Sequence, residues 1–123
     1  MRWRNVCACL LILATSQAEV FAQRPRLRRG TRLVVEATAY CQRGETSSGD
    51  RTSRGLVAAD TRMLPIGTVF RIVGPSSEYG GVYWVADRGP EIRGREIDIF
   101  MPNCREAKRF GRRRLELRIL KAG

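Results

Sequence analysis

Short apolar segments that alternate with turn-forming residues constrain the fold of this 123-residue chain most strongly. From residue 33 onward, each segment is rich in β-branched or aromatic residues and is bounded by glycine, proline or serine. This alternation predicts six β-strands, at residues 33–40, 55–60, 68–73, 82–87, 95–100 and 113–120. We therefore predict an all-β fold, a small closed barrel in which closure removes the exposed strand edges.

One segment departs from this alternation. Asn103 is a favourable helix N-cap, and Glu106 stands three residues later, where it completes a capping box. Ala107 and Phe110 supply apolar contacts, and a glycine that can end a helix follows. The sequence therefore predicts one short helix over residues 104–110.

The first 22 residues have the features of an export signal. Arg2 and Arg4 give a positive start, and residues 6–14 form an unbroken apolar run. Val20 and Ala22 are the small residues that precede a cleavage site. The apolar run is too short to span a bilayer as a mature helix, so a cleaved signal peptide over residues 1–22 is favoured over an uncleaved anchor. A lipoprotein-like box at Cys9 is discounted, because it does not follow the apolar run.

Removal of this signal peptide would leave a strongly basic domain. The chain has a formal net charge of +11, and loss of two arginines and one glutamate with the signal leaves +10. Residues 23–32 are read as a flexible basic arm. Such a charge attracts polyanions, and export favours those of the cell envelope over nucleic acid, with peripheral association with the envelope. A solvated basic face without a partner stays open as the alternative.

Cys41 and Cys104 would remain after cleavage. Two cysteines in an exported chain favour one disulfide, and two separate buried thiols are the alternative. The chain contains no histidine, which excludes histidine-dependent catalytic triads, and two cysteines are too few for a structural zinc site. No metal or cofactor is required by the pattern, although three aspartates can in principle hold a cation.

Three aspartates stand where a carboxylate is costly. Asp60, Asp87 and Asp98 each follow or interrupt an apolar strand, and burial raises a carboxyl pKa, as a general acid requires. For Asp60 and Asp87, which precede turns, the alternative is that they accept backbone N–H bonds. Asp98 is the strongest candidate because its strand continues and its side chain points away from Ile97 and Ile99.

Three separated segments resemble, in order, the three-aspartate (3D) domain. They read ATAYCQRG at 37–44, RGLVAADTRMLPIGTVFRI at 54–72 and VADRGPEIRGREIDIFMPNCREAKRFGRR at 85–113. This domain forms the catalytic part of MltA-type lytic transglycosylases and occurs in exported proteins that act on the cell wall. The resemblance covers about residues 33–120 and implies a six-stranded double-psi β-barrel.

The resemblance also implies a reaction, the cleavage of the MurNAc–GlcNAc β-1,4 bond in peptidoglycan glycan strands. One carboxylic acid protonates the leaving oxygen and the muramyl C6 hydroxyl attacks, which gives a 1,6-anhydro product. By position, Asp98 would be that acid, Asp87 would orient or tune it, and Asp60 would hold the barrel or the sugar. Thr38 and Tyr40, a hydroxyl and an aromatic residue beside the aspartate strands, are expected to line the groove and contact the substrate, with core packing as the alternative for Tyr40.

The sequence departs from the family pattern in the turn DRGPEIRG, residues 87–94. The family commonly has a glycine-rich turn there, whereas the Asp-Arg-Gly-Pro opening is similar to rare-lipoprotein-A and expansin-like barrels. Arg93 is expected to keep the substrate-binding role of the usual lysine. The chain also has no room for the second domain of MltA-type enzymes, so an open, shallow groove is expected.

Two main functions of different classes follow from these observations. The first is a peptidoglycan-cleaving enzyme in the periplasm, at the outer membrane or secreted. The second is a non-catalytic, expansin-like barrel that binds peptidoglycan or another wall polyanion, and a structural or inhibitor-like exported domain is a third. Binding without cleavage predicts salt-sensitive association that does not depend on Asp98.

Overall fold

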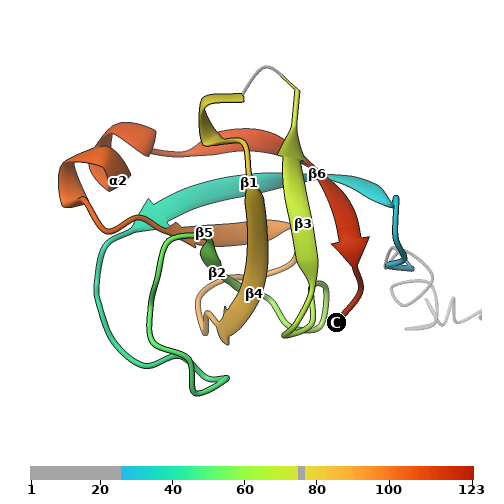
Figure 1. Ribbon diagram of the computed structural model, residues 1–123, viewed down its shortest axis with the longest axis horizontal. Coiled ribbons are helices and arrows are strands. Elements are labelled where there is room, and N and C mark those ends of the chain that lie inside the picture. The colour runs from blue at the N-terminus through green and yellow to red at the C-terminus, as the bar shows by residue number, and fades with distance from the viewer. Residues whose placement is uncertain (1–25, 75–76) are drawn as a thin grey trace, which may run out of the picture.

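The computed structural model describes residues 26–74 and 77–123, and its strands form a closed barrel (Figure 1). Each predicted strand is present, with ends within one residue of the prediction. The strands and the helix are β1 Arg32–Tyr40, β2 Leu56–Ala59, β3 Val69–Val73, β4 Val82–Arg88, β5 Glu96–Phe100, α2 Cys104–Phe110 and β6 Arg113–Lys121. A short 3-10 helix, η1 Ser77–Tyr79, interrupts the β3–β4 connection, which the sequence reading treated as a turn.

The strand order around the barrel is β1-β5-β2-β4-β3-β6. Strand β1 pairs with β5 in parallel, and β2 pairs with β4 in parallel, while the other four pairings are antiparallel. Sequence neighbours are therefore mostly not barrel neighbours, and the chain crosses the ends of the barrel to connect them. This closed six-stranded barrel with one short helix confirms the predicted double-psi class.

Alternation along the strands separates a filled interior from the outer surface. Inward-facing side chains are fully buried, as for Val35 and Ala37 on β1, Val57 on β2 and Ile97 and Ile99 on β5. A second, smaller cluster lies on the outside of the barrel, where Leu56, Ala86 and Phe100 are buried and Tyr40 and Trp84 pack against them. Strand alternation alone predicts that the outer surface is exposed to water, whereas the outer cluster makes this part of it apolar.

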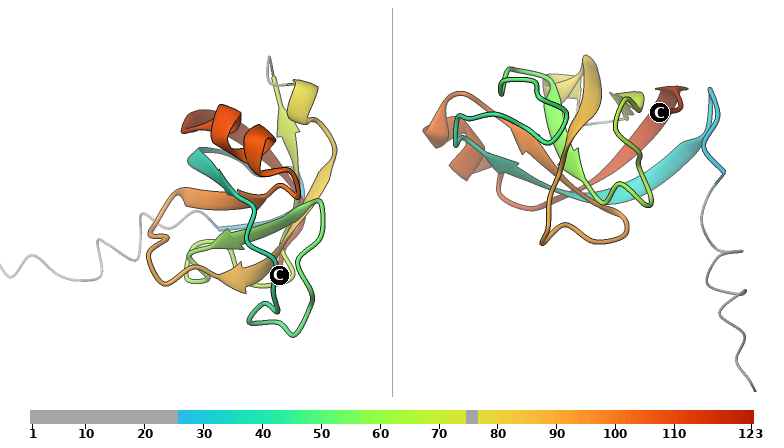
Figure 2. Two further views of the ribbon diagram at one scale, coloured as in Figure 1. Left: turned by 90° about the vertical axis from the view of Figure 1, so that its left-hand side faces the viewer. Right: turned by 90° about the horizontal axis from the view of Figure 1, so that it is seen from below.

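Helix α2 packs beside the end of β1 (Figure 2). Asn103 caps it, because its side-chain oxygen accepts hydrogen bonds from the backbone N–H groups of Arg105 and Glu106. A disulfide joins Cys41, directly after β1, to Cys104, the first residue of the helix. The predicted disulfide is therefore present, and it fixes the helix to the strand that carries Thr38 and Tyr40.

The predicted signal peptide lies outside the described residues. The predicted arm enters them at residue 26, and its last residues are paired with β6, since the Gly30 N–H donates to the Ile119 carbonyl at 2.7 Å and the Ile119 N–H donates to the Thr31 carbonyl at 2.8 Å. Within the described part of the chain, no helix has both the length and the apolar character to cross a membrane. The long segment 41–55 projects from the barrel between β1 and β2 (Figure 2).

Candidate functional site

Four side chains form a row across the outside of the barrel. Thr38 on β1 is paired with Asp98 on β5, and Asp98 is paired with Ala58 on β2, which is itself paired with Asp87 on β4. Directly paired residues project on the same face of a sheet. We call Thr38, Asp98, Ala58 and Asp87 the acidic row.

The acidic row places the two carboxylates two strand spacings apart, which corresponds to roughly 9–10 Å between their backbones. Ala58 is the small residue between them, so no large side chain separates the two aspartates. A register shift in the β2–β4 pairing, between Val57 and Ala58, brings Asp87 rather than Ala86 opposite Ala58. A β-bulge of this kind re-aims a side chain, and here it turns Asp87 into the row.

The carboxyl of Asp98 has a raised pKa. Asp98 is half-buried among the outer-face side chains, and burial raises the pKa of its carboxyl above the ordinary aspartate value. The Thr38 hydroxyl donates to Asp98 Oδ1 at 3.0 Å, which opposes this rise because the bond favours the charged form. Burial is thus the main cause of the raised pKa, and Asp87, which the resemblance implies would orient or tune Asp98, is not among the causes of this shift.

Tyr40 lies on the same face, two residues beyond Thr38 on β1. Its ring packs edge-on against Phe100 at 5.5 Å, and its hydroxyl is buried without a hydrogen-bond partner among the described residues. Burial, with the negative charges of Asp87 and Asp98, raises the pKa of Tyr40 to about 12. The phenol is therefore a neutral, unpartnered donor next to the two acids.

Asp87 is held by a residue that the sequence reading missed. Its Oδ1 accepts hydrogen bonds from both the backbone N–H, at 3.1 Å, and the hydroxyl of Ser47 in the segment 41–55. The same hydroxyl accepts a bond from the Arg88 N–H at 3.0 Å. Nothing in a serine-rich turn marks one serine as the partner of a distant strand, so only the folded arrangement identifies Ser47.

Asp60 lies apart from the acidic row and has a different environment. Its carboxylate accepts three hydrogen bonds from Arg62, through the backbone N–H, Nε and Nη2, and a fourth from the Gly94 N–H at 2.8 Å. The Arg62 hydrogen bonds, opposed in part by burial, hold the pKa of Asp60 well below its ordinary range. Asp60 therefore fastens the turn that ends at Gly94 to the end of β2.

Arg93 lies on the Asp60 side of the site. A hollow of about 310 Å³ is lined by Arg93 together with Asp60, Arg62, Arg88 and neighbouring residues of the 89–92 turn. Of the described residues that line it, none belongs to the acidic row. The structure thus brings Thr38, Tyr40, Asp87 and Asp98 together, and groups Arg93 with Asp60.

The acidic row offers carboxyl and hydroxyl chemistry rather than a metal-binding arrangement. Across residues 26–74 and 77–123, the Cys, Asp and Glu side chains form no group of three or more that could hold a metal ion. One carboxyl with a raised pKa and a second carboxylate two strands away can together transfer a proton and stabilise a developing positive charge.

Two curated proteins of Bacillus subtilis (strain 168) are similar to this chain. One is YabE, whose name refers to cell wall shaping, with 27% identity over 119 residues, covering 89% of this chain and 28% of YabE. The other is the cell wall-binding protein YocH, with 29% identity over 97 residues, covering 72% of this chain and 32% of YocH. The chain therefore spans about a third or less of the length of these relatives.

The fold is similar to that of a solved enzyme structure, and the sequence matches a known domain family. MltA from Escherichia coli, a lytic transglycosylase, superposes with a TM-score of 0.50 at 18% identity over 65% of this chain and 28% of MltA. Residues 55–121 match the 3D domain family, a span that contains Asp60, Asp87 and Asp98. This match covers more than half of the sequence, and the chain belongs to the 3D domain family.

Proposed function

We propose that this protein is an exported enzyme that cleaves the MurNAc–GlcNAc β-1,4 bond of peptidoglycan as a lytic transglycosylase, with Asp98 as its acid. The observation that carries the proposal is the half-buried Asp98, whose pKa is raised by burial on an accessible outer face of the barrel. A general acid must hold its proton near the working pH, and burial is a physical route to that state. The cell wall names of YabE and YocH and the fold shared with MltA support the substrate class.

The proposed reaction uses one carboxyl group twice. Asp98 donates its proton to the glycosidic oxygen as the bond from that oxygen to the muramyl C1 breaks. The muramyl C6 hydroxyl then bonds to C1 and gives its proton to the Asp98 carboxylate, so the acid is regenerated and no water is consumed. Thr38 engages Asp98 Oδ1, which leaves Oδ2 to transfer the proton.

The neighbouring groups have supporting roles in this proposal. The Asp87 carboxylate, fixed by Ser47, would stabilise the positive charge that develops at C1 as the bond breaks. The Tyr40 ring, packed edge-on against Phe100, would form an apolar wall beside the sugar, because its hydroxyl is buried. Arg93, in the hollow beside Asp60, would bind an anionic group farther along the strand.

The second candidate is a barrel that binds peptidoglycan or another wall polyanion without cleaving it. The observation that favours it is the charge, with a formal net value of +11 and a hollow that gathers Arg62, Arg88 and Arg93. Binding of this kind weakens as salt rises and is unchanged by loss of the Asp98 charge.

Digestion of purified peptidoglycan, analysed by mass spectrometry, separates the two functions. We expect 1,6-anhydro-muropeptides from the wild type and none above background from Asp98→Asn. Glu116→Gln, at an acid on β6 that pairs with Arg32, is the control and should digest as the wild type does. Equal release by Asp98→Asn would remove Asp98 as the acid, and salt-sensitive binding with no release from the wild type would favour the binding function.

A further inference from the structure

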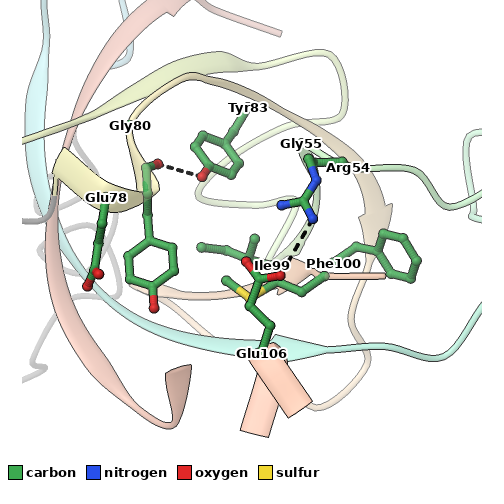
Figure 3. A pocket seen from close by; sticks show the side chains of 10 residues that line it. Arg54, Gly55, Glu78, Gly80, Tyr83, Ile99, Phe100 and Glu106 are labelled. Carbon is green, nitrogen blue, oxygen red and sulfur yellow. Dashed lines mark hydrogen bonds and ion pairs between the residues drawn. The ribbon is translucent and has the colours of Figure 1, made fainter. Parts of the chain in front are cut away.

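A second groove opens where β4 begins and β5 ends. Two adjoining hollows, of about 130 and 490 Å³, share Glu78, Tyr79 and Glu106 in their linings, and Figure 3 shows the first of them. The larger hollow falls in the roughly 300–1,000 Å³ range of small-ligand pockets. We call this feature the charged groove, and it is defined by Arg54, Glu78, Tyr79, Glu106, Arg109 and Arg113.

Arg113 lies on one side of the charged groove and makes three contacts there. Its Nη1 lies 3.0 Å from Glu78 Oε1, and its Nε donates to the Phe110 carbonyl at 2.9 Å. Its guanidinium also covers the Tyr79 ring at 4.8 Å from the centroid. These contacts use the charges of Arg113 and Glu78 to build the wall of the groove.

The other side of the charged groove carries a looser ion pair. Arg54 Nη2 lies 3.5 Å from Glu106 Oε2, beyond the usual 2.7–3.2 Å range of N–H···O hydrogen bonds, and the Arg54 side chain is 67% exposed. An exposed pair of this kind contributes about 0–1 kcal/mol, so a ligand can displace it at little cost. Arg54 and Glu106 are therefore available to opposite charges on a bound molecule.

Glu106 does not complete the capping box that the sequence predicted. The Asn103 side chain caps α2 as expected, but the Asn103 N–H donates no described hydrogen bond to the Glu106 carboxylate. The carboxylate instead faces Arg54 across the groove (Figure 3). Only half of the predicted capping box forms, and the remaining acid is directed into the charged groove.

We infer that the charged groove binds the stem peptide of peptidoglycan, an inference that rests on the proposed function. A stem peptide with a diamino acid carries several carboxylates and one ammonium group, so it is zwitterionic with an excess of negative charge. The groove has three arginines and two glutamates in its lining, which is the complementary excess. A peptide carboxylate would pair with Arg54, and the ammonium group would pair with Glu106.

Phe100 connects the charged groove to the acidic row. It lines the groove, and its ring packs against Tyr40 on the outer face of the barrel. It also follows Asp98 by two residues on β5, which corresponds to about 7 Å along the strand. A stem peptide attached to a sugar at Asp98 would therefore lie within reach of Arg54 and Glu106.

The test uses a soluble, sugar-free stem tetrapeptide, N-acetyl-L-Ala–D-Glu–diaminopimelate–D-Ala, titrated into the intact protein and followed by backbone amide NMR shifts; the acetyl group leaves the diaminopimelate ammonium as its one positive charge. We expect shifts at Gly55, Tyr79 and Tyr83, and a Kd raised about tenfold by Glu106→Gln or Arg54→Gln, as for loss of one charge-assisted bond. Glu116→Gln is the matched control, because Glu116 pairs with Arg32 at 3.4 Å on another part of the surface, and its Kd should equal that of the wild type.

Three results would overturn the inference: no groove shifts, equal affinity of Glu106→Gln and Glu116→Gln, or equal shifts with a peptide-free N-acetylglucosamine oligomer. Amide dispersion checks that each variant is folded, and Asp98→Asn should bind the peptide as the wild type does. Normal peptidoglycan digestion without peptide binding would end this inference alone. Peptide binding without digestion would end only the proposed cleavage.

Discussion

Asp98 and Asp60 are the same residue type on one small barrel, yet their surroundings drive their protonation in opposite directions. Asp98 accepts one described side-chain hydrogen bond, from the neutral hydroxyl of Thr38, and burial raises its pKa. Asp60 has only 7% of its surface exposed, but four hydrogen bonds from Arg62 and Gly94 hold its pKa well below the ordinary range. The number and charge of the donors, rather than burial alone, therefore separate an acid from an ionised structural group.

The largest expected effect comes from exchanging each aspartate for asparagine. Asp98→Asn should lower the rate of peptidoglycan cleavage by about 10²–10⁴-fold, the usual contribution of a general acid. Asp60→Asn, measured in the same release assay at a temperature where it stays folded, should retain most of the rate. The comparison breaks if Asp60→Asn loses as much activity as Asp98→Asn.

Removal of the disulfide should lower the free energy of unfolding. Cys41 follows Tyr40 directly and is joined to Cys104 across 63 residues of sequence. Loop-entropy arguments assign about 4 kcal/mol to a bond that closes a loop of this length. Denaturant unfolding of a Cys41→Ser/Cys104→Ser variant measures the difference, and an unchanged unfolding midpoint would show that the bond adds no stability.

Asp60→Asn should destabilise the fold by about 2 kcal/mol through loss of charge-assisted hydrogen bonds. The folded pKa of Asp60 is depressed, so its contribution is present above the unfolded value of about 3.9 and is lost as pH falls through the folded pKa. Wild type and variant should thus differ at neutral pH and converge in acid. Thermal unfolding across this range checks the sign, and a difference that grows in acid would contradict it.

Asp98→Asn should have the opposite effect on stability. The raised folded pKa means that burial of the ionised carboxylate costs stability above that pKa and costs nothing below the unfolded one. The variant should therefore unfold at a higher temperature than the wild type at neutral pH, with the gap closing in acid. A variant less stable than the wild type at neutral pH would show that the charged form is favoured at this position.

The smallest effect is expected from Thr38→Val. The Thr38 hydroxyl lowers the pKa of Asp98, so its removal should raise that pKa further and move the alkaline limb of the pH–activity profile upward. Thr52→Val is the control, because it deletes a hydrogen bond of similar length, from the Gly44 N–H, in an exposed loop. If the pH–activity profile moved in both variants, or in neither, the Thr38 hydroxyl would not be the group that lowers the pKa of Asp98.

The barrel was predictable from the sequence because its signals are local. Alternation along each strand and the glycine- and proline-rich turns fix the element ends, and the phase of Asp98 against Ile97 and Ile99 places it on the outer face. For Asp60 the sequence left several roles open, because its partner Arg62 is nearby in sequence but its partner Gly94 is not. The contact of Ser47 with Asp87 and the ion pair of Glu106 with Arg54 join residues that are far apart in the sequence, so local sequence patterns do not predict them.

Titration of the aspartate carboxyl carbons by NMR in the folded wild-type protein tests the central claim most directly. We predict that Asp98 titrates above the reference value of about 3.9 and that Asp60 stays ionised well below it. A pKa for Asp98 at or below the reference, or one for Asp60 above it, would contradict the division between a proton-donating and a structural aspartate.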